Sequence, residues 1–233
     1  MKVAIMQPYF FPYISYFQLI NAVDKFVVYD NIQYTKKGWF SRNRFLLNGK
    51  EKLFTIPIKK DSDFLDVRER ELAGNSIKER KKILAQLENA YRKAPYFQET
   101  FQFLKPLFLQ ETQNLFQFIY NSIIEVTEKL EIDTNIIISS KLPIKHELKA
   151  EEKVIELCNY LKANTYINSI GGKELYRKEQ FNENDIHLKF LQSNPIKYSQ
   201  FKESFVPWLS IIDLFMFNGF SGTKKFLNEY QLI

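Results

Sequence analysis

The second half of the chain alternates short apolar runs with longer amphipathic runs, and this alternation restricts the fold more than any other feature. Strands are predicted at 135–138, 165–168 and 187–191, and helices at 147–161 and from about 173 separate them. Strands joined through a helix run parallel in one sheet, because the connection crosses back over the sheet before the next strand begins. The pattern therefore predicts an α/β fold with a mainly parallel sheet flanked by helices.

The rest of the chain adds strands and a helical middle segment. Further strands are predicted at 3–6, 26–29 and 53–58, with helices at about 13–22, 206–217 and 223–229. A helical insertion is predicted at about 76–131, in which Ser76 and Glu79 would form a capping box. Since 45% of the 233 residues are apolar, the chain can bury a sizeable core, and we expect a single domain over 1–233.

Cysteine, histidine and charge content narrow the function classes. One cysteine, Cys158, excludes an internal disulfide, and His146 and His187 are too far apart to predict a metal site. No apolar run approaches the roughly 18 residues of a membrane span, and no secretory signal pattern opens the chain, so we expect a cytoplasmic protein. The net charge of +6 fits an acidic partner, but the basic residues at 77–93 alternate with glutamates and apolar positions. That spacing indicates a solvated helix, and no stable nucleic-acid partner is expected.

Three polar and aromatic clusters lie near the ends of the predicted N-terminal strands and suggest one site. The first cluster, residues 7–13, holds two prolines, two tyrosines and Gln7. The second is residues 29–34, and the third is residues 36–44, which include lysines, arginines and Trp39. Ligands of open parallel sheets bind beyond the carboxyl ends of the strands. The clusters are therefore expected to meet at that edge of the sheet.

Residues at other strand ends are candidates for holding an anion. Ser139 and Ser140 could bind a phosphate or carboxylate, although short polar strand ends are common without a ligand. Gly171 and Gly172 would let the backbone approach a ligand closely, and an ordinary αβ turn would use glycine as well. Asp30 either acts as a general base or caps a turn.

The segment 36–44 combines cations with rings that stack. A guanidinium holds phosphate through two parallel bonds, and Trp39 or Tyr34 could stack on a base or sugar. Only one of Arg42 and Arg44 is expected to face the site. The alternative to a binding role for segment 36–44 is a basic turn exposed to solvent. Asp213 lies on an otherwise apolar helix and is expected to pair with one of these arginines.

The residues of these clusters carry a resemblance to the WbqC-like family. It rests on the run 5–17 with Gln7-Pro8-Tyr9, on Tyr29-Asp30, Ile32-Gln33-Tyr34 and Asn43-Arg44, and continues through 165–168, Gly171-Gly172 and 209–213 with Asn218-Gly219. Many members have histidine where this chain has Met6, so a histidine there is not the catalyst here. The resemblance implies a role in bacterial surface-polysaccharide (O-antigen) synthesis, where the family is linked with attaching an amino acid such as glycine to amino sugars.

A more distant resemblance concerns the fold. Nucleotidylyltransferases and pantothenate synthetase also open with a strand, a proline-bearing loop and an amphipathic helix, so a Rossmann-like or nucleotidylyltransferase-like sheet is implied. Their signature has two histidines two residues apart at the helix start, whereas this chain has Tyr13 and Tyr16. ATP use is therefore not implied by the motif.

The leading hypothesis from the sequence is N-acyl or aminoacyl transfer, such as glycyl transfer or amide ligation, onto a nucleotide-linked amino sugar. The acyl group would come from ATP-driven activation or from an aminoacyl-tRNA. Catalysis is assigned to Asp30, Gln7 and Tyr9, and substrate binding to Tyr13, Gln33, Tyr34, Lys36, Trp39, Asn43, Arg44, Lys59, Ser139, Ser140, Gly171 and Gly172, with no metal. The alternative is a non-catalytic protein that binds a nucleotide sugar or a glycosyltransferase complex, which requires an exposed aromatic run at 9–13. Other polysaccharide-biosynthesis enzymes are candidate partners in either case.

Overall fold

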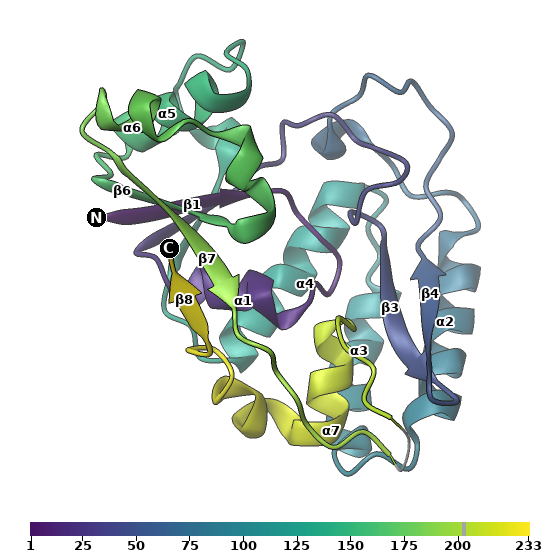
Figure 1. Ribbon diagram of the computed structural model, residues 1–233. Helices are drawn as coiled ribbons and strands as arrows, with labels where there is room; N and C mark the ends of the chain where they lie inside the picture. Colours follow the sequence, from purple (N-terminus) through teal and green to yellow (C-terminus); the bar gives the residue numbers. More distant parts are fainter. Residues whose placement is uncertain (202–203) are drawn as a thin grey trace.

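A six-stranded sheet forms the centre of the computed structural model, which describes residues 1–201 and 204–233 (Figure 1). The strands lie in the order β5, β2, β1, β6, β7, β8. Their bounds are β1 Lys2–Met6, β2 Lys25–Val28, β5 Asn135–Ile138, β6 Thr165–Ser169, β7 His187–Ser193 and β8 Tyr230–Leu232. Every pair of neighbours is parallel except β7 and β8. The predicted α/β class and mainly parallel sheet are confirmed.

The strand order places a topological switch point between β1 and β6. From β1 the chain builds outward through β2 to β5, and it then returns to the other side of β1 to add β6 and β7. This is the order of a doubly wound sheet, in which the two connections leave the central strands in opposite directions. A crevice therefore opens at the carboxyl ends of β1 and β6.

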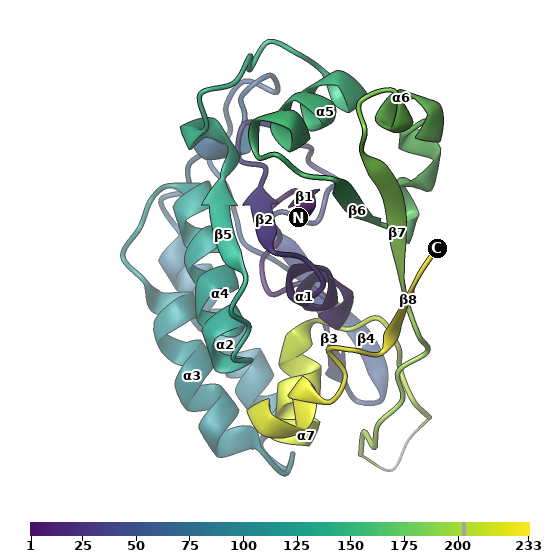
Figure 2. The same ribbon diagram turned by 90° about the vertical axis from the view of Figure 1, so that its left-hand side faces the viewer.

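Alternating residues of the central strands separate two cores on the two faces of the sheet. Val3 and Ile5 pack with Leu157 of helix α5 (Ala150–Tyr160) and Phe181 of α6 (Lys178–Asn182). Ala4 points to the opposite face, toward the larger cluster that includes helix α1 (Ile14–Asn21). Figures 1 and 2 show α5 and α6 on one side of the sheet and α1 and α4 on the other. The two-residue period of a strand produces this division.

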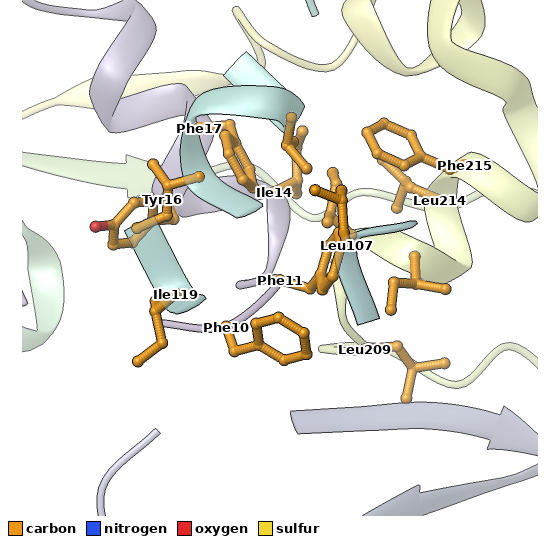
Figure 3. Close-up of a cluster of buried hydrophobic side chains, with 14 of the residues drawn as sticks. Phe10, Phe11, Ile14, Tyr16, Phe17, Leu107, Ile119, Leu209, Leu214 and Phe215 are labelled. Atoms are coloured by element: carbon orange, nitrogen blue, oxygen red, sulfur yellow. The ribbon is translucent and has the colours of Figure 1, made fainter. Parts of the chain in front are cut away.

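Helices α2, α3 and α4 fill most of the predicted helical segment and build the larger core. They span Ser76–Tyr91, Phe97–Leu109 and Leu115–Lys129, and α7 (Ile211–Lys224) packs with α3. Figure 3 shows Phe10 and Phe11 within this cluster, beside residues of α3, α4 and α7. The capping box predicted at Ser76 is wrong, because Asn75 occupies the N-cap position and makes no side-chain capping bond. A capping box forms instead at Asp66 and Glu69.

Residues of the third N-terminal cluster form a hairpin outside the main sheet. Strands β3 (Arg42–Leu47) and β4 (Lys50–Thr55) pair antiparallel, so the strand predicted at 53–58 begins and ends earlier than expected. Their connection is the dipeptide Asn48-Gly49, with φ of 50° and 71°. Two central residues with positive φ are typical of the turn whose twist matches a two-residue hairpin.

The C-terminal region differs from the prediction in several elements. A single helix, α7, replaces the two predicted helices, and it is kinked at Gly219, whose φ is 65°. The chain then turns into β8, which pairs antiparallel with β7, where a helix was expected to run to 229. After β6, the expected helix is divided into a 3₁₀ segment, η3 (Ile170–Leu175), and the short α6. No helix built from the described residues combines the length and apolar character needed to cross a bilayer.

Candidate active site at the strand switch point

A cleft of about 1060 Å³ opens at the carboxyl ends of β1, β2 and β6, and we call it the switch-point cleft. Loops that follow these three strands supply most of its wall, and the start of α5 closes one side. The polar side chains that line it belong to Gln7, Asn31, Gln33, Asp66, Arg68, His146, Glu147, Lys149, Lys153 and Asn168. Its position agrees with the ligand position in doubly wound sheets.

The loop after β1 places an oriented amide in the cleft. The Tyr9 hydroxyl donates a hydrogen bond of 3.0 Å to Gln7 Oε1, and the Tyr16 hydroxyl donates to the Gln7 carbonyl at 3.0 Å. Burial raises the pKa of Tyr9 to about 12, so its hydroxyl stays protonated and keeps donating near neutral pH. Since Oε1 is occupied, the Gln7 amide NH₂ is the group left to donate to a ligand.

Lys153 brings a buried cation to the wall of the cleft. Its side chain extends from α5, only 3% of the residue is exposed, and Nζ donates to the His146 carbonyl at 3.1 Å. The ammonium also lies 5.0 Å from the centre of the Tyr29 ring. Desolvation lowers the pKa of Lys153, and no ion pair among the described residues includes it. A buried lysine without a direct ion pair is uncommon, and the carboxylates of Asp66 and Asp30 act on Lys153 without forming one.

A carboxylate and a guanidinium face the cleft from η1 (Val67–Glu69) and the residue that precedes it. Asp66 and Arg68 both line it, with Arg68 Nε 3.7 Å from Asp66 Oδ2. Partial burial raises the pKa of Asp66, and the neighbouring Glu69 adds to the effect. Asp66 is therefore more basic than an ordinary aspartate, which suits a group that accepts a proton.

His146 lines the cleft with both ring nitrogens in use. Asn31 Nδ2 donates to Nδ1 at 2.8 Å, and Nε2 donates to the Leu142 carbonyl at 2.9 Å, which assigns the tautomer. The segment after η2 (Ser139–Lys141) brings His146 to Asn31, beyond the end of β2. The ring holds Asn31 in place rather than offering a free base.

Asn168 and Gly172 fit together at the end of β6. A Cβ built on Gly172 would lie 2.7 Å from Asn168 Nδ2, whereas nothing lies within 4 Å of one built on Gly171. Asn168 Oδ1 accepts a hydrogen bond from the Ser169 backbone N–H at 2.7 Å, which fixes the amide. Both glycines line the cleft, but only Gly172 is required to be small.

A second hollow of about 360 Å³ adjoins the cleft, and we call it the aromatic chamber. It is lined by Met6, Tyr9, Pro12, Tyr13, Ser15, Tyr16, Leu19, Trp39, Asn43, Arg44, Ser169 and Trp208. Met6, Tyr9, Trp39 and Ser169 also line the switch-point cleft, so these side chains form a shared wall.

Trp39 is held between the two arginines of β3. The guanidinium carbons of Arg42 and Arg44 lie 5.1 and 4.9 Å from the centre of the indole. Of the two arginines, Arg44 lines the aromatic chamber and Arg42 lines neither hollow. The two side chains nevertheless contact the same ring, because residues two apart on a strand point to the same face. Both cations contact the same ring and orient it at the shared wall.

The predicted site residues fall into three groups. Gln7, Tyr9, Gln33, Trp39, Gly171 and Gly172 line the switch-point cleft, and Tyr13, Asn43 and Arg44 line the aromatic chamber together with Tyr9 and Trp39. The structure places Asp30, Tyr34, Lys36, Lys59, Ser139 and Ser140 outside both.

The third group makes contacts within the protein. Asp30 is buried and accepts hydrogen bonds from the Ser140 backbone N–H at 2.8 Å and from the Ser140 hydroxyl at 2.6 Å. This pair ties the end of β2 to the end of β5, and Ser139 is fully buried beside it. Tyr34 is buried beneath the Arg70 guanidinium, which lies 5.0 Å from the ring centre.

Two lysines of that group and one aspartate also have partners in the protein. Lys36 and Lys59 form surface ion pairs of 2.8 and 2.7 Å with Asp63 and Glu71. The expected pairing of Asp213 with an arginine is wrong. Its buried carboxylate accepts hydrogen bonds from three neutral donors, the hydroxyls of Tyr91 (2.6 Å) and Tyr198 (2.5 Å) and the amide of Gln200 (2.8 Å).

Comparison with known proteins places the chain in a family. The model of the WbqC-like protein family matches residues 7–225 and so covers most of the residues that line the cleft and the chamber. The chain belongs to the WbqC-like protein family. The resemblance noted in the sequence is thus confirmed over almost the whole chain.

This WbqC-like protein has a curated relative whose function is not described. It is 28% identical over 220 residues to an uncharacterized Mycobacterium tuberculosis protein, Rv1507c, with 93% of each chain covered. No solved structure matches the chain. The Rossmann-like comparison therefore depends on the strand order alone.

Several residues of the cleft were missed by the sequence argument. Asp66 and Arg68 lie in a polar stretch that was interpreted as a connection between elements. His146 precedes the helix predicted at 147–161 and Lys153 lies within it, and neither belongs to a recognisable motif.

Proposed function

We propose that this protein binds a nucleotide-linked amino sugar in the switch-point cleft and transfers an acyl or aminoacyl group, such as glycyl, to its amine in bacterial surface-polysaccharide synthesis. The observation that carries the proposal is Lys153, a buried cation at the wall of the cleft without an ion-pair partner among the described residues. Lys149 and Arg68 add two more positive charges to the same wall, and Arg68 is paired with Asp66. A diphosphate linking nucleoside and sugar would supply a counter-charge for Lys153.

The cleft also contains groups suited to amide formation. The amine nitrogen attacks the acyl carbonyl carbon, the carbonyl oxygen gains negative charge, and the leaving group departs with its bonding electrons. The Gln7 NH₂, oriented by the Tyr9 hydroxyl, is placed to donate to that oxygen. Asp66 takes the proton lost by the amine, since its raised pKa makes it a better base than a solvated aspartate. Asp30, whose carboxylate is bonded to Ser140, positions the strand ends in this proposal.

The structure gives less support to the alternative of a non-catalytic docking protein. That alternative requires an exposed aromatic run at 9–13 for contact with a partner. Phe10 and Phe11 are fully buried in the larger core (Figure 3). The other residues of the run, Tyr9, Pro12 and Tyr13, line the aromatic chamber. The run therefore contributes to the core and the site wall more than to an exposed patch.

A mass-spectrometric assay tests the reaction. Purified protein is incubated with a panel of nucleotide-linked amino sugars, with glycine and ATP in one arm and glycyl-tRNA in another. A product heavier by one glycyl unit in either arm is expected, and its formation identifies the donor. If the turnover rate falls by less than about tenfold in both Gln7→Ala and Asp66→Asn, the roles assigned to these residues are contradicted.

Calorimetry tests the binding step separately. Lys153→Met keeps the length of the side chain and removes its charge, so the fold is retained and affinity for a nucleotide-linked sugar is expected to fall at least tenfold. Lys178→Met is the matched control, because Lys178 is an exposed lysine of α6 that lines neither hollow. Unchanged affinity in Lys153→Met would remove the observation on which the proposal depends.

A further inference from the structure

The aromatic chamber has a composition that differs from that of the cleft beside it. Tyr9, Tyr13, Tyr16, Trp39 and Trp208 contribute rings to its wall, and Arg44 is the charged residue among its lining side chains. The rings of Tyr13 and Trp208 lie 5.4 Å apart at an angle of 57°. Such a wall fits a planar group better than a sugar or a short peptide, because flat rings stack on aromatic faces.

Trp208 combines two unusual properties. It is 59% exposed, among the more exposed large apolar side chains of the described residues. Its backbone is also left-handed, with φ of 62°, a conformation that a bulky side chain rarely adopts. Strained residues gather at binding sites, where the surrounding structure holds them in place. Here the strain holds an indole at the chamber mouth, where a ligand could cover it.

Arg44 supplies a donor that the protein does not use. Its Nη1 pairs with Glu51 at 2.6 Å, while its buried Nε has no hydrogen-bond partner among the described residues. A buried N–H without an acceptor is costly. A phosphate oxygen next to the stacked ring would accept a hydrogen bond from the guanidinium beside its ion pair with Glu51.

We propose that the aromatic chamber binds the adenosine phosphate portion of the acyl donor, with the base against Tyr13 and Trp208 and the phosphate near Arg44. This inference depends on the proposed function, because it assigns the second substrate of the same reaction. An aminoacyl adenylate made with ATP and an aminoacyl-tRNA both present an adenosine next to the acyl group. The shared wall of Met6, Tyr9, Trp39 and Ser169 then brings the donor beside the amine held in the cleft.

The tryptophans provide a direct test, because the chain has two of them and both line the chamber. AMP is the first probe, followed by ATP and by the trinucleotide CCA, which stands for the end of a tRNA. Saturable quenching of intrinsic tryptophan fluorescence by AMP is expected. Tighter binding of ATP than of CCA indicates an aminoacyl adenylate as the donor, and tighter binding of CCA indicates an aminoacyl-tRNA. Fluorescence unchanged by AMP would overturn the proposal.

Variants connect the signal to the chamber. Trp208→Ala is expected to weaken AMP binding, measured by calorimetry, by about tenfold or more, whereas affinity for a nucleotide-linked sugar stays within about twofold. Phe64→Ala is the control, because Phe64 is 86% exposed and lines neither hollow. AMP binding that is equally tight in Trp208→Ala and the unmodified protein would refute the assignment. If the unmodified protein binds AMP but no nucleotide-linked sugar, the proposed function is contradicted while the assignment of adenosine to the chamber stands.

Discussion

Replacing Tyr91 with phenylalanine should destabilise the protein far more than the loss of one oxygen atom suggests. The Tyr91 hydroxyl is fully buried, donates to Asp213 Oδ1 at 2.6 Å and accepts from the Leu46 backbone N–H at 2.7 Å. It thereby joins α2, β3 and α7 at one point. Tyr91→Phe keeps the ring and its packing but breaks both bonds.

The expected cost follows from the two groups left behind. A hydrogen bond to a charged acceptor contributes about 1.5–3 kcal/mol, and a buried N–H without a partner costs about 1–3 kcal/mol. Together they predict a loss of about 3–5 kcal/mol in the free energy of unfolding, a large part of the roughly 5–15 kcal/mol typical of a domain.

The loss should also depend on pH. Desolvation already raises the pKa of Asp213 above its ordinary value of 3.8, against the effect of its three donors. Removing one donor raises it further. When the pKa of a carboxyl is higher in the folded state than in the unfolded chain, the folded protein loses stability as the pH rises from the unfolded-state pKa to the folded-state pKa. The difference between the variant and the unmodified protein should therefore increase once the pH exceeds the raised folded-state pKa of Asp213 in the unmodified protein.

Urea unfolding at pH 5 and pH 7 measures both effects. Tyr160→Phe is the control, because Tyr160 is 48% exposed, and its free energy of unfolding should change by less than about 0.5 kcal/mol. A loss below about 1 kcal/mol in Tyr91→Phe, or a loss that shrinks toward pH 7, would refute the account of Asp213 as an ionisable carboxylate held by its donors.

Three further predictions follow from local geometry. Gly172→Ala should displace the Asn168 amide and weaken nucleotide-sugar binding in calorimetry, whereas Gly171→Ala should bind normally; equal affinities would show that the contact has no role. Gly49→Ala places a side chain at φ of 71° and should cost about 1 kcal/mol in thermal unfolding, so an unchanged midpoint would argue against the turn geometry. Burial raises the pKa of Cys158 to about 12, so a thiol reagent should react only after unfolding, and rapid labelling of the native protein would contradict this.

The fold was predicted best where a single period of apolar residues, either that of a strand or that of a helix, dominated the sequence. The strands at 135–138 and 165–168 differ from β5 and β6 by at most one residue, because their apolar runs are short and bounded by polar turns. The hairpin was missed although Asn48-Gly49 is among the strongest hairpin motifs, since the arginines before it were interpreted as a turn. The last strand, β8, has only three residues and depends on pairing with β7, which no local pattern records.

The site was predicted only where it follows strand ends. Gln7, Tyr9, Gly171 and Gly172 could be found because the carboxyl edge of a parallel sheet is a known place for ligands. Lys153 and Asp66 could not, since they reach the cleft from a helix and from a long loop whose path depends on tertiary packing. Asp30 has a residue type that suits catalysis, but whether it faces a ligand or Ser140 is decided by how β2 and β5 lie together.

The central position of β1 also has a consequence for the order of events during synthesis. β1 can pair with β2 once the first 28 residues are available, but its other neighbour starts at Thr165, which pairs with Lys2. Contacts this distant in sequence form slowly, and nascent chains emerge from the N-terminus first. The switch-point cleft can therefore be completed only after about 70% of the chain has left the ribosome, and until then one edge of β1 stays open to pairing with other chains.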